Sequence, residues 1–182
     1  MVPSECDLTI IPLKGYDHSL LFELPVRPSP NLPNWQSVYL YPSLCFFEGT
    51  IVSVGRGTDF PFQVYGHPDF STGSFFFTPR SMPGASLHPK LENEGCYGQN
   101  LTGYAENFSR NENQLSLVYL IYAHELLSEK HTFFTDYFNL LAGSDKLKGQ
   151  IEAGLSEEAI RRSWQEGLKQ FRNIRSKYLL YD

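Results

Sequence analysis

The residues with the most evident chemistry form a glycine-rich string, Gly55-Arg56-Gly57-Thr58, a short distance after Glu48. Glycine admits positive φ and lets other groups approach the backbone closely, so the N–H groups on both sides of the arginine are accessible. The guanidinium adds five N–H donors in one plane. Together they suit a carboxylate or a hydroxylated ligand with one negative charge. The alternative is a structural turn in which Arg56 caps a helix or pairs with Asp59, and so short a string does not decide between the two.

Two further stretches carry polar side chains on irregular backbone. Residues 25–33 contain four prolines, which fix φ and force extended geometry, so this run is stiff and non-helical. Its Ser29 and Asn31 could line a cleft, or the run could be a structural strap. Residues 79–90 form a long irregular segment, of a length that in compact domains is usually functional or disordered. That segment carries Arg80, Ser81, His88 and Lys90.

Several other chemistries lack their patterns. His124 and Glu125 have no second histidine at the spacing of zinc proteases, and His131 is seven residues further on, so we predict no metal site. No nucleophile elbow accompanies the serines, and the glycine-rich string lacks the lysine of a phosphate-binding loop. No cofactor is therefore expected. A net charge of -5 argues against a nucleic-acid-binding surface, which normally has a basic excess.

The three cysteines form no close pair and no zinc spacing. Buried free thiols are expected, with one long-range disulfide as the alternative. No apolar run approaches the length of a membrane-spanning helix. Residues 1–14 lack the basic start of a signal peptide, and we expect Met1 to lie inside a longer protein. The cysteines are Cys6, Cys45 and Cys96.

The order of apolar patterns predicts an α+β fold in one domain, residues 1–182. A mixed or antiparallel sheet with irregular loops should fill the first two thirds, with helices clustered in the last third. Asn34 is a plausible N-cap for a short helix. The predicted strands are residues 8–13, 61–65, 73–78 and 95–101. The predicted helices are residues 114–127, 133–141 and 144–153, and a longer one from Ser156 whose apolar face includes Ile160, Trp164, Leu168 and Phe171.

Motifs along nearly the whole chain resemble the NamZ/YbbC-like exo-β-N-acetylmuramidases, a family of peptidoglycan glycosidases. The first group comprises residues 28–33, Tyr41-Pro42, Phe47-Glu48-Gly49-Thr50, Ser53, Gly55-Arg56-Gly57-Thr58 and Pro61-Phe62. The second comprises Phe77-Thr78-Pro79, Cys96-Tyr97-Gly98, Phe171-Arg172 and Tyr178-Leu179-Leu180-Tyr181.

The resemblance covers only the C-terminal half of that family's protein. It implies that a Rossmann-like N-terminal domain, absent from this chain, carries much of the catalytic machinery and forms the other wall of the active-site cleft. It also implies an exported, periplasmic or cell-surface glycoside hydrolase that removes N-acetylmuramic acid from non-reducing ends of wall fragments. The isolated C-terminal half should then be inactive or nearly so. The alternative is a stand-alone carbohydrate-binding or protein-interaction domain without catalysis.

The resemblance gives the glycine-rich string a specific ligand. N-acetylmuramic acid carries a lactyl carboxylate, which we expect Arg56 to bind through a directional fork. Thr58, Ser53 and Asn31 would then contact the sugar hydroxyls or the acetamide. Ser29 and Arg80 are further candidates for substrate binding. Glycosidases usually use two carboxylates, so Glu48 is a candidate catalytic residue, with a structural role as the alternative.

Overall fold

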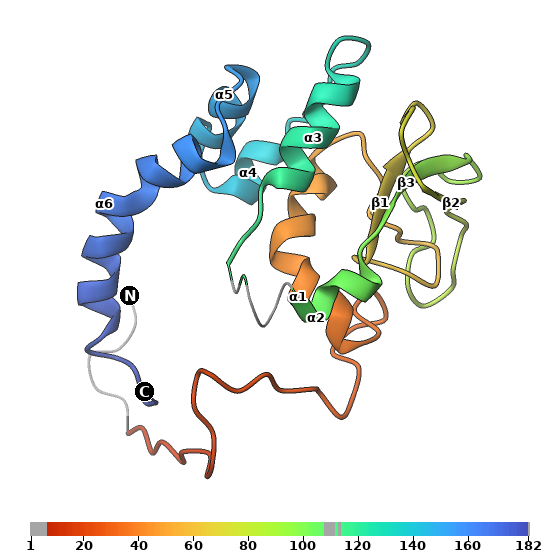
Figure 1. The fold of residues 1–182 in the computed structure, drawn as a ribbon. Helices are drawn as coiled ribbons and strands as arrows, with labels where there is room; N and C mark the ends of the chain where they lie inside the picture. The colour runs from red at the N-terminus through yellow and green to blue at the C-terminus, as the bar shows by residue number, and fades with distance from the viewer. Residues whose placement is uncertain (1–6, 108–111, 113, 182) are drawn as a thin grey trace. The chain divides into compact units, whose positions relative to one another are not determined.

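The computed structural model describes residues 7–107, 112 and 114–181, and the chain divides into two compact units. Residues 23–163 form the larger unit, and residues 1–22 join residues 164–182 in the smaller one. Figure 1 shows the course of the chain. The helices of the larger unit are α1 (Trp35–Leu44), α2 (Ala105–Asn107), α3 (Val118–Leu127), α4 (Phe138–Ala142) and α5 (Lys146–Glu152), with the 3₁₀ helices η1 (Cys45–Gly49) and η2 (Thr102–Tyr104).

A three-stranded antiparallel sheet occupies one side of the larger unit (Figure 1). It consists of β1 (Val64–His67), β2 (Phe75–Phe77) and β3 (Cys96–Asn100) in the order β1-β3-β2. β3 is central and pairs with both neighbours, with Gly66 and Phe75 both opposite Gly98. The prediction of an α+β fold with an antiparallel sheet is confirmed.

The first helix and the segment after it position the glycine-rich string. The Asn34 side chain accepts from the N–H of Ser37, and the Ser37 hydroxyl accepts from the N–H of Asn34, which forms a capping box at the start of α1. η1 continues directly from α1. Phe47 of η1 is fully buried and stacks on Tyr65 of β1 with ring centroids 5.0 Å apart. This aromatic contact attaches η1, which precedes the glycine-rich string, to β1, which follows it.

The helices that follow the sheet are shorter than their apolar patterns predict. α3 begins at Val118 rather than at residue 114. The Phe133–Phe134 pair is extended, not helical, because Thr50 forms a β-bridge with Phe134 and α4 starts only at Phe138. Tertiary pairing thus overrides the local helical pattern there.

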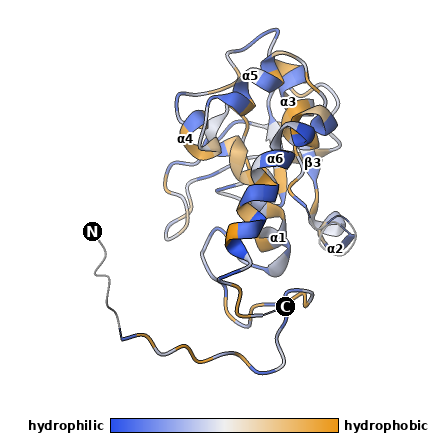
Figure 2. Cartoon of the chain, turned by 90° about the vertical axis from the view of Figure 1, so that its left-hand side faces the viewer, coloured by the Kyte–Doolittle hydropathy of each residue, from blue (hydrophilic) through white to orange (hydrophobic). Residues whose placement is uncertain are grey.

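The predicted strand at residues 8–13 is wrong. This segment is extended but unpaired, and Figure 2 shows hydrophobic residues along it. Leu8 is 71% exposed and Ile11 87% exposed. A run with strand-like composition becomes a strand only when a partner satisfies its backbone and covers one face, and the described residues supply neither here.

The smaller unit contains most of α6 (Glu157–Arg175), which begins in the larger unit. Ile160 is buried, whereas Phe171 is 58% exposed and Ile174 is 56% exposed. The Tyr181 hydroxyl accepts from the backbone N–H of Leu13 across 2.7 Å. Among the described residues, no helix combines the length and the apolar character needed to cross a membrane.

Cys45 and Cys96 both carry free thiols, but the expectation that these thiols are also buried holds for Cys96 alone. Cys45 is half-buried and Cys96 is buried. The third cysteine, Cys6, lies outside the described residues. Burial raises the pKa of the Cys96 thiol to about 12, with a smaller contribution from the charge of Glu94, so this thiol is protonated and unreactive at neutral pH.

Candidate functional site

The glycine-rich string forms a tight turn in which neither Gly55 nor Gly57 has room for a side chain. Gly55 has φ +74 and Gly57 has φ +80, both in the left-handed region. A Cβ on Gly57 would lie 2.4 Å from the carbonyl oxygen of Arg80. The Arg80 N–H also donates to the Gly57 carbonyl across 2.9 Å. The turn is therefore clamped against the start of the long segment at residues 79–90.

The hydroxyl groups next to the turn stabilise it from within. Thr58 Oγ1 donates to the carbonyl of Gly55 across 2.7 Å and accepts from the N–H of Phe60 across 3.0 Å. Ser53 Oγ accepts from the N–H of Gly55 across 3.3 Å. Ser53 also bridges to Gly66 of β1, so the segment before the turn is attached to the sheet. These contacts hold the arginine at a fixed place on the surface.

Arg56 pairs with Glu48, not with Asp59. Its Nη1 donates to Oε1 of Glu48 across 3.0 Å, and the two side chains are 40% and 24% exposed, respectively. The Nε of Arg56 is buried and has no hydrogen-bond partner among the described residues. The Arg56 side chain as a whole is nevertheless partly exposed, and among the described residues only its Nη1 is bonded. The ion pair thus leaves part of the guanidinium available.

These side chains line a hollow with a volume of about 170 Å³. It is smaller than the roughly 300–1,000 Å³ usual for small-molecule sites, so it fits a substituent or one part of a ligand. Glu48 is the one carboxylate among the lining residues. The residues that line the hollow are Glu48, Val52, Ser53, Val54, Arg56, Ser86, His88, Pro89 and Lys90.

Lys90 lines the hollow with a buried ammonium group, whereas the sequence analysis named it only among the polar residues of the segment 79–90. Its Nζ donates to the carbonyl oxygens of Phe47 across 2.8 Å and of Glu48 across 3.4 Å, and also to that of Thr50. Burial of the ammonium lowers the pKa of Lys90 to about 8; the charge of Glu48 opposes this shift and that of Arg56 adds to it. Below that pH, two cations face one carboxylate, which gives the hollow a net positive charge.

Tyr41 adds flat, partly exposed surface near the ion pair, and its ring packs against the buried Phe62. Tyr41 is 37% exposed and its ring lies 4.8 Å from that of Phe62. Burial, followed by the nearby charge of Glu48, raises the pKa of the Tyr41 phenol. The hydroxyl is therefore neutral at ordinary pH and can donate a hydrogen bond.

The structure brings some of the predicted binding residues together and not others. Glu48, Ser53 and Arg56 share the hollow, whereas Thr58 is engaged within the turn. Asn31 Nδ2 donates to the carbonyl of Ala85 across 2.9 Å, and Ser29 Oγ accepts from the N–H of Asn31 across 3.2 Å. Asn31 therefore anchors the segment that contributes Ser86, His88 and Lys90, and Ser29 in turn holds Asn31. The Arg80 side chain is exposed and is not among the lining residues.

Comparison with known proteins identifies relatives over almost the whole chain. A peptidoglycan β-N-acetylmuramidase NamZ from Bacillus subtilis (strain 168) is 35% identical over 193 aligned positions, covering 97% of this chain and 46% of that protein. A crystal structure of a DUF1343 family protein from Bacteroides fragilis NCTC 9343 has a TM-score of 0.87 at 44% identity, covering 97% of this chain and 50% of that one. A second structure described in the same way has a TM-score of 0.61 at 18% identity, covering 86% of this chain and 45% of that one, and supports the fold alone.

The chain spans about half the length of these relatives. Residues 39–181 match the family described as "Exo-beta-N-acetylmuramidase NamZ, C-terminal". That match includes η1, the glycine-rich turn, the sheet and α6. On this evidence, the chain belongs to the family of NamZ exo-β-N-acetylmuramidase C-terminal domains.

Proposed function

We propose that this chain is the C-terminal part of a peptidoglycan-degrading exo-β-N-acetylmuramidase and supplies one wall of its substrate cleft. In this proposal, the hollow around Arg56 receives the lactyl carboxylate of N-acetylmuramic acid at the non-reducing end of a wall fragment. The observation that carries the proposal is the partly exposed Arg56 guanidinium, bonded to Glu48 through Nη1 alone, in a hollow where the charges of Arg56 and Lys90 outweigh that of Glu48.

The size and chemistry of the hollow support a carboxylate as its occupant. A volume of about 170 Å³ is too small for a complete pocket but suits a three-carbon acid substituent. Arginine and backbone N–H groups give such an anion directional, charge-assisted hydrogen bonds. Tyr41 offers a ring face for the sugar beside it, an arrangement that suits tyrosine, with its apolar ring and polar hydroxyl.

The rest of the enzyme would come from another part of a longer protein. Relatives about twice as long support this view, and so do the exposed apolar side chains of the smaller unit. Phe171, Ile174 and Tyr178 are 58%, 56% and 76% exposed, which is unfavourable unless something covers them. We also propose that the full-length protein is exported, since its polymer substrate lies in the wall.

Inhibition constants test the role of Arg56 in the full-length protein. N-acetylmuramic acid and N-acetylglucosamine differ by the lactyl group, so only the acid should depend on the guanidinium. A hydrogen bond to a charged group contributes about 1.5–3 kcal/mol, so Arg56→Ala should weaken inhibition by the acid roughly ten- to a hundredfold. Inhibition by N-acetylglucosamine should change little. Arg162→Ala, at an exposed position on α6, is the control. Equal losses of inhibition for both sugars would show that the hollow does not bind the lactyl carboxylate.

Glu48 has a positioning role in this proposal, because its carboxylate holds Nη1 of Arg56. Glu48→Gln should raise KM for a chromogenic muramide while kcat stays within about tenfold of wild type. A loss of about 10²–10⁴ in kcat would instead make Glu48 a general acid or base.

A specific observation favours the carbohydrate-binding alternative. Phe76 and Tyr97 lie side by side on β2 and β3 with ring centroids 5.1 Å apart, and they are 56% and 48% exposed. Paired exposed rings can stack on sugars without any catalytic partner. Calorimetry with the 182-residue chain and soluble wall fragments tests this: heat of binding that Tyr97→Ala abolishes would favour the alternative.

A further inference from the structure

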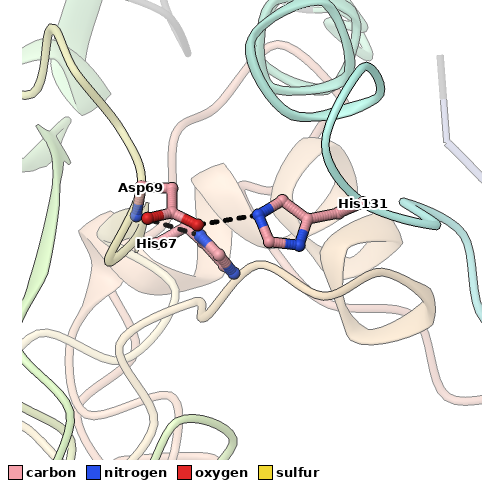
Figure 3. A group of neighbouring side chains, drawn as sticks. All are labelled: His67, Asp69 and His131. Atoms are coloured by element: carbon pink, nitrogen blue, oxygen red, sulfur yellow. Dashed lines mark hydrogen bonds and ion pairs between the residues drawn. The ribbon is translucent and has the colours of Figure 1, made fainter.

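Three side chains of types that can bind a metal ion converge at the end of β1, outside the hollow described above. They are His67, the last residue of β1, Asp69 in the turn that follows, and His131 in the loop after α3. Figure 3 shows the three side chains pointing toward one another. Each offers one ligand atom, and these atoms all lie within 4.8 Å of one another.

The contacts within the group are short and polar. Nε2 of His131 lies 2.7 Å from Oδ2 of Asp69, and the backbone N–H of Asp69 points at Nδ1 of His67 across 3.2 Å. The two imidazole rings are inclined at 63° with centroids 5.1 Å apart. His67 is only 7% exposed, whereas the side chains of His131 and Asp69 are 33% and 49% exposed. The group is thus fixed at its base by His67 and open to water at its rim.

The donor set selects a class of ion. Imidazole nitrogen with a carboxylate is typical of zinc and similar transition metals, whereas calcium and magnesium prefer oxygen ligands. Ligands 2.0–2.2 Å from a tetrahedral zinc lie about 3.4 Å from one another. The ligand atoms of the three side chains lie between 2.7 Å and 4.8 Å apart, and small side-chain rotations can bring them to this spacing.

We propose that His67, Asp69 and His131 bind a divalent transition-metal ion of the zinc type, with water at the fourth position. The ion takes Nδ1 of His67 in place of the contact from the Asp69 N–H, and it replaces the direct hydrogen bond between Asp69 and His131. Three protein ligands and an exposed rim match the open form of zinc coordination.

Such an ion would connect segments that are 62 residues apart in sequence, between Asp69 and His131. Both segments also contact residues 51–53, which lie just before the glycine-rich turn. Gly66, beside His67, pairs with Ser53, and the Phe133 carbonyl, two residues beyond His131, accepts from Ile51. The metal would therefore brace this region, and its effect should appear as stability independent of any sugar.

The test uses the 182-residue chain, freed of metal by chelation and titrated with Co²⁺ and Zn²⁺. We expect one equivalent of Co²⁺ to give the visible absorption of a tetrahedral site, and Zn²⁺ to displace it. Ligand binding to the folded state raises stability, so saturating Zn²⁺ should raise Tm by several degrees.

Variants separate an ion site from a simple hydrogen-bonded pair. Asp69→Asn keeps a side chain that can bond His131, so its metal-free Tm should stay close to wild type while the Kd for Zn²⁺ rises at least tenfold. His131→Ala should abolish the cobalt spectrum. His88→Ala removes a histidine whose side chain is 90% exposed, elsewhere in the chain, and should leave the spectrum unchanged. Absence of a cobalt spectrum in the wild type, or a Zn²⁺-induced Tm shift that survives in His131→Ala, would overturn the proposal.

Discussion

Replacement of Lys90 by methionine is the most informative change to the architecture of the hollow. Methionine fills similar space but donates nothing, so the carbonyl oxygens of Phe47, Glu48 and Thr50 each lose the bond from the ammonium. The Phe47 carbonyl keeps the N–H and hydroxyl of Thr50 as donors. Hydrogen bonds to a charged group contribute about 1.5–3 kcal/mol each. Burial of the ammonium opposes the stabilisation that these hydrogen bonds give. The fall in pKa from 10.5 to about 8 corresponds to about 3 kcal/mol at 1.36 kcal/mol per unit.

Three such bonds less about 3 kcal/mol for burial leave an expected net loss for Lys90→Met of about 2–6 kcal/mol, or a fall in Tm of roughly 4–24 °C for a chain of this size. Thermal and urea unfolding followed by circular dichroism would measure it. Lys130→Met is the matched control, because Lys130 is exposed, and its Tm should stay within about a degree of wild type.

The pH dependence gives a second, independent readout. Between pH 8 and pH 10.5 the folded state has released the Lys90 proton while the unfolded state still holds it. Unfolding then takes up a proton, so the contribution of Lys90 to stability rises with pH across this window and is constant below it. The stability difference between wild type and Lys90→Met should thus increase by up to about 3 kcal/mol from pH 7 to pH 10.5. A flat difference, together with a Tm loss no larger than that of Lys130→Met, would refute this account of Lys90.

Two further predictions concern the elements that position the site. Gly57→Ala should destabilise the chain by at least about 1–3 kcal/mol, because the position has φ +80 and the new Cβ would meet the Arg80 carbonyl. Gly103→Ala, with nothing within 4 Å, is its control, and equal Tm values for the two variants would contradict the clamped turn. Asn34→Ala should cost about 1 kcal/mol in urea unfolding by removal of the cap on Ser37, and an unchanged midpoint would mean that the capping box contributes nothing.

The sequence predicted features that depend on neighbours in the chain. Asn34 caps α1 because an asparagine can bond the N–H three residues on, whatever the rest of the fold does. The strands at Phe75–Phe77 and Cys96–Asn100 follow from dense apolar and aromatic runs between turn residues. The glycine-rich turn follows from the need for positive φ at Gly55 and Gly57.

The features that sequence reasoning missed depend on distant segments. Lys90 contacts carbonyl groups more than forty residues earlier in the chain. The residues next to Lys90 in the sequence give no indication that its ammonium is buried. His67 and Asp69 meet His131 only because the loop after α3 folds back to the end of β1. The expectation of no metal site considered His131 with His124 on the same stretch of chain, and so could not detect this convergence.

The central claim is that the hollow around Arg56 holds the carboxylate of an anionic sugar. The most direct test is a crystal structure of the full-length protein with N-acetylmuramic acid bound. Charge-assisted hydrogen bonds of this kind are about 2.7–2.9 Å long, and we predict that a lactyl oxygen lies within that distance of the Arg56 guanidinium. A well-defined sugar whose carboxylate binds elsewhere, with the Arg56–Glu48 pair unchanged and facing solvent, would contradict it.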